Sequence, residues 1–450
     1  MDGYGYRLDP TWVDGDLEKK TQLGRTAWQK IVRQLTRYRY QTLGGILVAI
    51  ILPAALKGRL PELFGGALLG NSFDNALLGS VVAFVLGFLI YRKMTGIPGA
   101  NAITNVIPAF LGSYALVAAF FLILRLDYSR FQLLGSFLLA ICWFTFIQLL
   151  IAKLRRPRFG LVGDQNTLLQ TAGANVEFEV LDAPEMAERE GKLPLVVDFE
   201  SSTVDNHWQR YLSEAVVSGR PVFDSEAFFE STQGRVRILN LAKHSIGQTP
   251  TDSIYEPAKR YTDAVISIVA LLALLPLLVF LALWIKLDSP GPVFFIQKRV
   301  GHRGRTFSMI KFRSMTSRPG LASSLEGDVT KDGDQRITRV GKFIRKVRID
   351  EIPQLINVIM GEMSIIGPRP ETIHLSKLYE AEIPNYRYRH VVRPGITGWA
   401  QVRQGHVAAV GDAEEKLEYD FFYVKNFSLW LDLLIAYKTL RVMLTGFGAK

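Results

Sequence analysis

The chain has 450 residues, of which 48% are hydrophobic and only 21% are charged, and it carries a net charge of +11. A mean hydropathy of +0.15 excludes a disordered chain and argues against a purely soluble one. The single cysteine, Cys142, excludes a disulfide framework and a cysteine-based zinc site. The net charge is +10 over residues 1–158, −8 over 159–254 and +9 over 255–450. We therefore expect three parts with different surroundings.

Four charge-poor apolar stretches in the first third predict four transmembrane helices. They cover 43–56, 76–91, 103–124 and 131–152. The last two have 22 residues each, enough to cross a hydrocarbon core of about 30 Å. The alternative is four buried core helices. We disfavour it because the sequence around these stretches offers no amphipathic segments that could bury them. The sequence thus predicts a cytoplasmic N-terminal segment over 1–40 and a four-helix transmembrane bundle over 41–154.

The short loops give these helices an orientation. Lysine and arginine are dense before the first stretch, between the second and third, and after the fourth. Such ends face the cytoplasm under the positive-inside rule. Everything after residue 153 is then expected in the cytoplasm. The first 40 residues contain no apolar region of a cleavable signal peptide.

A fifth apolar run, 264–285, is predicted to enter the membrane without crossing it. Pro276 near its middle removes a helical hydrogen bond and favours a kink. Basic residues flank both ends, and each limb is long enough to reach only about half-way through the bilayer. We expect a re-entrant helix–break–helix that enters and leaves by the same leaflet. The alternative is a kinked full span, which would export a basic domain.

The acidic middle region, 155–254, predicts a small Rossmann-like α/β module. Strand-like and helix-like patches alternate at 159–162, 176–181, 193–199, 207–218 and 221–223. This alternation is typical of βαβ units. Gly160 and Gly163 do not complete a GxGxxG motif, so a nucleotide site is only weakly indicated. We favour a cytoplasmic regulatory or dimerisation module, and with it a homodimer.

A cluster of cations directly precedes a pair of carboxylates in the basic C-terminal part. The cations are Arg336, Arg339, Lys342, Arg345, Lys346 and Arg348. Asp350 and Glu351 follow, and a helix is expected to begin at about 350–353 and to end at Gly361. A helix N-terminus beside cations favours bound phosphate and keeps a carboxylate ionised.

Two adjacent carboxylates can divide the chemistry between them. One can attack as a nucleophile while the other holds Mg²⁺ that screens phosphate charge. In the alternative interpretation, Asp350 is only an N-cap and the basic run is a surface against anionic lipid.

Neighbouring segments favour the phosphate site. Arg369 lies between two prolines in 364–371, and such a rigid turn fixes a guanidinium for bidentate phosphate contact. Segment 291–315 predicts a hairpin that carries Lys311 and Arg313 as further phosphate-binding candidates. The alternatives are a turn with an exposed arginine and a basic membrane-facing surface.

These motifs together resemble the bacterial sugar transferase family, the monotopic phosphoglycosyl transferases. In order they are Lys259-Arg260-Tyr-Thr-Asp263, Gly291-Pro292 with Gln297, Lys311-Phe-Arg-Ser-Met315, Arg336-Ile-Thr-Arg-Val-Gly341, Asp350-Glu351-Ile-Pro-Gln354, Gly367-Pro-Arg-Pro370 and Arg393-Pro-Gly-Ile-Thr-Gly398. The resemblance covers about residues 255–450. The preceding parts are similar to the large subgroup that makes undecaprenyl-diphosphate-linked hexoses for exopolysaccharide, capsule or O-antigen.

The resemblance implies roles for individual residues. Asp350 matches the nucleophilic aspartate and Glu351 the Mg²⁺-associated glutamate. Arg345 and Arg369 match positions that hold substrate phosphate, and Pro276 matches the re-entrant hinge.

The sequence departs from the family pattern at two positions. Leu275 precedes the hinge proline where relatives often have a small polar residue, and Arg348 stands where many have Ser or Thr.

The resemblance also implies a location. We expect an α-rich monotopic catalytic domain over 255–450 on the cytoplasmic face of the bacterial inner membrane, in contact with its lipids.

The expected reaction is a two-step exchange. Asp350 attacks the β-phosphorus of a UDP-sugar, UMP leaves, and undecaprenyl phosphate takes the phosphosugar. UDP-glucose is the expected donor, with UDP-galactose or a UDP-N-acetylhexosamine as alternatives. A glycosyltransferase that moves the sugar alone, with Asp332 and Asp334 as a DxD motif, is a rival, as is a non-enzymatic membrane scaffold. No nucleic-acid partner is expected, since the basic segments adjoin apolar ones.

The last segment, 428–444, mixes leucines with charged residues and is predicted to be an interfacial helix. The alternative is a core helix of the catalytic domain. The six histidines are scattered without ligand spacing, and we assign them no metal.

Overall fold

The computed structural model describes residues 37–56, 72–95, 102–154, 158–163, 176–189, 193–199, 201–238, 255–316, 334, 336–404 and 410–445. The chain divides into two units, Met1–Gly234 and Arg235–Lys450. Nearly all of the predicted segment 1–40 and the first half of the DxD motif, Asp332-Gly333, lie outside the described residues.

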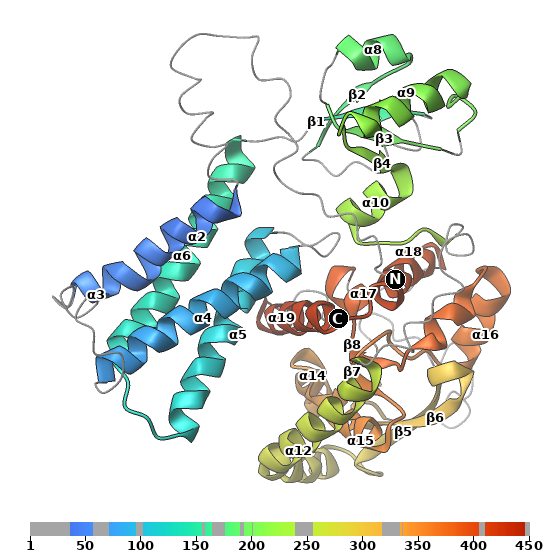
Figure 1. Cartoon of the computed structure of the whole chain (residues 1–450). Helices are drawn as coiled ribbons and strands as arrows, with labels where there is room; N and C mark the ends of the chain where they lie inside the picture. The colour runs from blue at the N-terminus through green and yellow to red at the C-terminus, as the bar shows by residue number, and fades with distance from the viewer. Residues whose placement is uncertain are drawn as a thin grey trace. The chain divides into compact units, whose positions relative to one another are not determined.

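The apolar stretches of the first unit form helices. α2 (Tyr38–Ile46) continues through a π-helical turn, η2 (Leu47–Ile51), into α3 (Leu52–Leu56), and is followed by α4 (Ser72–Thr95), α5 (Ala102–Ile123) and α6 (Arg130–Leu154). Helix α4 packs against α5 and α6, and η2 against α6 (Figure 1). Rings of Phe84, Phe110 and Phe144 pack together between them. With α12 of the second unit, five helices of the described chain are long and apolar enough to cross a membrane.

The acidic region of the first unit folds as the predicted parallel α/β module. Its elements are β1 (Arg158–Val162), β2 (Glu177–Val180), α8 (Pro184–Arg189), β3 (Leu195–Val197), α9 (Asn206–Val217), β4 (Val222–Asp224) and α10 (Ser225–Gln233). The strands are parallel in the order β2-β1-β3-β4. Trp208 and Leu212 of α9 pack on one face of the sheet, and Phe228 of α10 packs on the other. The strand and helix patches named from the sequence are thereby confirmed.

The second unit is α-rich with two small sheets. It contains α12 (Tyr255–Asp288), β5 (Phe294–Val300), η5 (His302–Gly304), β6 (Thr306–Phe312), α14 (Arg339–Lys346), η6 (Ile349–Glu351), α15 (Gln354–Met360), β7 (Ser364–Ile366), α16 (Ile373–Glu382), η7 (Tyr386–Val391), β8 (Gly395–Thr397), α17 (Trp399–Arg403), α18 (Val410–Lys425) and α19 (Leu429–Thr445). Strands β5 and β6 form the predicted antiparallel hairpin, and β7 pairs with β8 in parallel.

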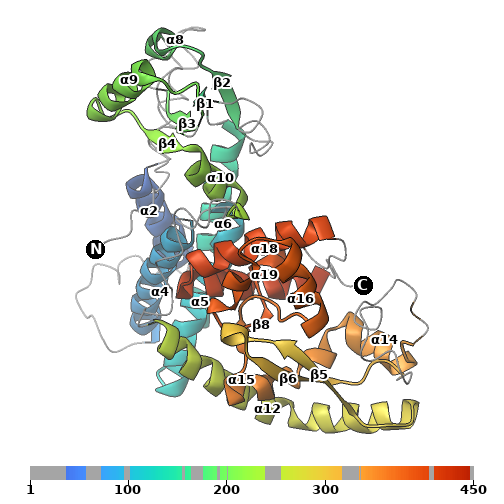
Figure 2. The same cartoon turned by 90° about the vertical axis from the view of Figure 1, so that its right-hand side faces the viewer.

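Helix α12 contains the whole predicted re-entrant range 264–285 and has Pro276 inside it. Figure 2 shows α12 running in two limbs of different direction, so the helix bends without an intervening loop. An internal proline accounts for a bend, because it removes a backbone hydrogen bond and clashes with the preceding turn. Apolar side chains such as Val269 and Leu272 are largely exposed along the helix, which indicates apolar surroundings. Whether both limbs share one leaflet stays a prediction.

Helix α19 is a core helix on one face. Leu431, Leu434 and Ile435 are fully buried, whereas Leu429 and Leu440 on the other side are exposed. The buried face fits the alternative, a core helix of the catalytic domain, because β7, β8 and α17 cover it. An interfacial location of the exposed face stays a prediction.

Candidate active site

The carboxylate pair lies on a short 3₁₀ turn that leads into α15. Arg348, just before the turn, has φ 56°, a left-handed conformation that is uncommon for a residue with a side chain. Asp350 and Glu351 belong to η6, and α15 follows after Pro353. The helix ends at Gly361, whose φ of 86° is the expected left-handed cap. The predicted helix start and stop are thus confirmed.

Glu351 forms ion pairs with two cations from distant parts of the chain. Arg369 donates from Nη2 to Oε1 of Glu351 at 2.7 Å, and Nζ of Lys311 lies 3.4 Å from the same oxygen. The Glu351 side chain is 11% exposed and that of Lys311 is 15% exposed. Strand β6 supplies Lys311, while the turn after β7 supplies Arg369. The structure therefore brings together three residues that the sequence placed in one site.

The two carboxylates have different acidities. Burial raises the pKa of Asp350, and the neighbouring charge of Glu351 raises it further against the opposing Lys311 and Arg345. Burial alone would raise the pKa of Glu351 as well. The positive charges of Arg369 and Lys311 have the larger effect and hold the pKa of Glu351 well below its usual range. The expectation that nearby cations keep a carboxylate ionised holds for Glu351. At Asp350, burial and the like charge raise the pKa to about 6, which still leaves the group mostly ionised at neutral pH.

Burial also acts on the cations of the site. It lowers the pKa of Lys311 to about 8, partly offset by Glu351. Arg345, in the last turn of α14, is near enough to lower the pKa of Asp350 by its charge. Arg348 likewise lowers the pKa of Glu351. A partly buried acid pair inside a group of cations is suited to binding phosphate groups.

Arg313 does not behave as predicted. Its guanidinium is 5% exposed and donates from Nη2 to the carbonyl of Ser289 at 2.6 Å, to its hydroxyl at 2.9 Å and to the carbonyl of Ile285 at 3.3 Å. These carbonyls belong to the end of α12, where the last backbone acceptors lack helical partners. The structure thus gives Arg313 the role of holding α12 against β6, and we exclude it from the proposed site.

A second layer of charges behind Arg369 was not predicted. Arg389 donates to the backbone carbonyl of Arg369 at 2.8 Å and forms a buried ion pair with Asp420 at 2.7 Å. Glu371 pairs with Lys416 and lies 3.9 Å from Arg389. This network fixes the turn that carries Arg369. Its members are far apart in sequence, and only Glu371 belongs to a motif noted above.

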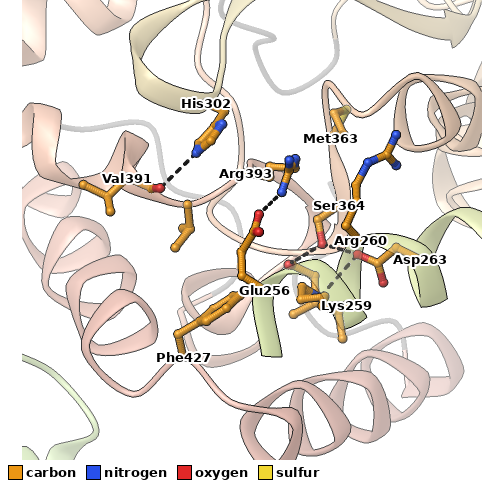
Figure 3. A pocket seen from close by; sticks show the side chains of 12 residues that line it. Glu256, Lys259, Arg260, Asp263, His302, Met363, Ser364, Val391, Arg393 and Phe427 are labelled. Carbon is orange, nitrogen blue, oxygen red and sulfur yellow. Dashed lines mark hydrogen bonds and ion pairs between the residues drawn. The ribbon is translucent and has the colours of Figure 1, made fainter. Parts of the chain in front are cut away.

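The first half of α12 is tied to the same domain by another polar cluster. Figure 3 shows Lys259, Asp263 and Ser364 lining a small pocket. Lys259 lies 2.6 Å from Asp432 and 3.4 Å from Asp263, which accepts from the Ser364 hydroxyl at 2.5 Å. Arg393 pairs with Glu256 at the same pocket. These groups satisfy one another, so the cluster joins α12 to β7 and α19.

Asp334, the described aspartate of the DxD motif, is bound to a neighbouring arginine and not to the carboxylate site. Asp334 forms an ion pair with Arg336 at 2.5 Å. The Arg336 guanidinium holds the pKa of Asp334 at about 2.

Comparison with known proteins identifies the family of the chain. Residues 254–446 match the model of the bacterial sugar transferase family. The chain is 40% identical over 414 residues to a UDP-N-acetylgalactosamine-undecaprenyl-phosphate N-acetylgalactosaminephosphotransferase of Aeromonas hydrophila, covering 90% of this chain and 94% of that protein. It is 41% identical over 213 residues to a UDP-glucose:undecaprenyl-phosphate glucose-1-phosphate transferase of Xanthomonas campestris pv. campestris, covering 47% of this chain and 43% of that protein.

A shorter relative is similar to less than half of this chain. An exopolysaccharide production protein of Rhizobium leguminosarum bv. phaseoli is 43% identical over 192 residues, which are 42% of this chain but 95% of that protein. An entire relative is therefore about as long as the matched region 254–446.

The carboxylate–cation site, the apolar helices and these similarities define a membrane-associated transferase. The chain belongs to the bacterial sugar transferase family.

Proposed function

We propose that this enzyme is a polyprenyl-phosphate sugar-1-phosphate transferase, which moves a hexose-1-phosphate from a UDP-sugar to undecaprenyl phosphate. The observation that carries the proposal is Asp350, half-buried beside the buried Glu351, with Lys311, Arg345 and Arg369 acting on the pair. Relatives named as undecaprenyl-phosphate sugar phosphotransferases support it.

The proposed reaction has two displacements at one phosphorus. A carboxylate oxygen of Asp350 attacks the β-phosphorus of the UDP-sugar, and the bond to the bridging oxygen breaks, so that UMP leaves with the electron pair. A phosphate oxygen of undecaprenyl phosphate then attacks the same phosphorus. The bond to Asp350 breaks, and the carboxylate is regenerated. Covalent catalysis of this kind lets a soluble donor and a lipid acceptor use the site in turn.

Mg²⁺ is the proposed cofactor, and the donor set suits it. Both cation contacts of Glu351 that the structure describes go to Oε1. Among the described residues no group of three or more acidic, histidine or cysteine side chains could hold a metal alone. Mg²⁺ is often bound by one or two carboxylates together with substrate phosphates. Glu351 would hold the ion, which would supply charge screening for the diphosphate.

The donor is the least constrained part of the proposal. The relative that aligns along nearly the whole chain is named for N-acetylgalactosamine, while the glucose-named relative above aligns with less than half of the chain. We therefore propose UDP-N-acetylgalactosamine as donor, with UDP-glucose, expected from the sequence, as the second candidate. The proposed setting is the first membrane step of exopolysaccharide, capsule or O-antigen synthesis. It would take place at the cytoplasmic face of the inner membrane, in a homodimer, with α12 re-entrant.

A donor panel tests the reaction class and the sugar together. The purified full chain is incubated with undecaprenyl phosphate, Mg²⁺ and UDP-N-acetylgalactosamine, UDP-glucose or UDP-galactose, and the released nucleotide is identified. We expect UMP, fastest with UDP-N-acetylgalactosamine. Release of UDP would mean that the sugar moves alone and would overturn the proposed class. A preference for UDP-glucose would overturn only the donor.

The pH dependence of the first half-reaction is expected to be bell-shaped. Asp350 must be ionised to attack, and burial with the charge of Glu351 raises its pKa to about 6, so UMP release should fall below about pH 6. Lys311 must stay protonated, and burial lowers its pKa to about 8, so the rate should fall above about pH 8. The measurement is UMP release without lipid acceptor, because the acceptor phosphate titrates as well.

Lys311→Arg is the matched variant for the alkaline side. An arginine stays charged at high pH, so the alkaline decline should move up while the acid decline stays. An unmoved alkaline decline would remove Lys311 from this role.

A further inference from the structure

An exposed aromatic strip runs from the second limb of α12 onto α14. The ring centroids of Phe280 and Trp284 are 5.8 Å apart, and those of Trp284 and Phe343 are 5.7 Å apart. Phe280 is 58% exposed, Trp284 39% and Phe343 48%. Val347, one turn beyond Phe343, is also exposed. We call these four residues the aromatic strip.

The strip is held in a fixed position by the opposite faces of the same helices. Leu281 and Ile285 of α12 pack with Val340 and Ile344 of α14 in one buried cluster. Ile349 packs against that cluster directly before Asp350. The strip therefore ends beside the turn that carries the proposed nucleophile, and Val347 is only three positions from Asp350.

Cations border the strip at the end nearer the site. Arg339, Lys342 and Lys346 are exposed on α14, on either side of Phe343 along the helix. Arg345 of the same helix acts on Asp350 by its charge. A continuous apolar strip that ends among cations complements a molecule with an apolar chain and an anionic end.

We propose that the aromatic strip binds the first isoprene units of the lipid acceptor and thereby aims its phosphate at Asp350. This inference rests on the proposed function. The occupant is the acceptor rather than bulk lipid, because the strip continues from α12 onto α14, the helix that leads to the turn carrying Asp350.

The two half-reactions separate this proposal from a structural role. Trp284→Ala and Phe343→Ala are made in the full chain. We expect each to raise the KM for undecaprenyl phosphate by about tenfold, the usual consequence of losing one aromatic contact of roughly 1.4 kcal/mol. UMP release from the donor without acceptor should be unchanged, since that step does not involve the strip. Phe343→Leu should recover part of the affinity.

Leu272→Ala is the matched control, because Leu272 is an exposed apolar residue on the other limb of α12. It should leave the KM for the acceptor unchanged. An acceptor KM that stays constant in both strip variants, or that rises equally in the control, would overturn the proposal, as would a matching loss in the donor half-reaction. Competition by added phosphatidylglycerol in detergent micelles would assign the strip to bulk lipid. If the unmodified chain releases no UMP from any donor, the proposed function itself fails, which is a distinct result.

Discussion

Asp350→Asn is expected to reduce sugar-phosphate transfer by about 10³-fold or more, because an amide oxygen cannot form the proposed acyl phosphate. Asparagine is nearly isosteric with aspartate, so the η6 turn and the ion pairs of Glu351 should persist. The variant should still bind the donor. The measurement is UMP release with and without undecaprenyl phosphate, together with the donor dissociation constant.

The covalent step can be tested directly. Wild-type enzyme incubated with UDP-N-acetylgalactosamine and no acceptor should gain one N-acetylhexosamine phosphate on the peptide containing Asp350, and Asp350→Asn should gain none. Glu362→Gln is a suitable control, since Glu362 accepts a hydrogen bond from Asn357 and lies outside the carboxylate pair. It should label like the wild type. Full turnover by Asp350→Asn would exclude Asp350 as the nucleophile.

The elements that matter for this chemistry follow local rules, and for that reason they could be predicted. Gly361 ends α15 because glycine adopts the left-handed conformation at low cost. The alternating patches of the acidic region become parallel strands and helices because their apolar residues have the matching periods. Asp350 and Glu351 are adjacent in sequence, so their proximity needed no tertiary information.

The rest of the site depends on contacts between distant segments. Lys311 lies on β6 and Arg313 directly after it, two positions away. Lys311 nevertheless contacts Glu351, whereas Arg313 binds the end of α12. No local pattern distinguishes them. The raised pKa of Asp350 is likewise a consequence of burial. Burial cannot be predicted by counting the cations that neighbour Asp350 in the sequence. The same holds for the pair Arg389–Asp420, which are 31 positions apart.

Arg348 illustrates how the local backbone serves the site. Its left-handed conformation lies in the short connection between α14 and η6. On one side of this connection Arg345 of α14 acts on Asp350 by its charge, and on the other Ile349 packs against the core cluster. A side chain in this conformation costs on the order of 1 kcal/mol relative to glycine. The charge of Arg348 also helps to lower the pKa of Glu351.

Arg369→Gln is expected to lower kcat/KM by roughly 10²-fold to 10³-fold. The reason is that the Arg369 guanidinium has two roles in the proposed site. Arg369 would contact the substrate diphosphate, and it holds Glu351 at 2.7 Å. Without it, Glu351 loses its shorter ion pair and keeps the more distant contact with Lys311 at 3.4 Å. Removing one partner of a buried ion pair leaves the other charge uncompensated, which is more costly than the pair was favourable.

The pH profile distinguishes loss of this charge from a general disturbance of the fold. The charge of Arg369 lowers the pKa of Asp350, so its removal should shift the acid decline of UMP release to higher pH. Arg369→Lys keeps the positive charge but loses the planar guanidinium, which can donate two parallel hydrogen bonds. It should therefore show a smaller loss, roughly tenfold, with the acid decline near its original pH.

Arg336→Gln serves as the control for removing a guanidinium, since Arg336 pairs with Asp334 outside the carboxylate site. It should change neither the acid decline nor the donor half-reaction by more than about twofold, as expected for a site away from the chemistry. An Arg369→Gln enzyme with an unshifted acid decline would contradict the electrostatic role. In that case the activity loss would have to come from the turn that Arg389 fixes through the Arg369 carbonyl.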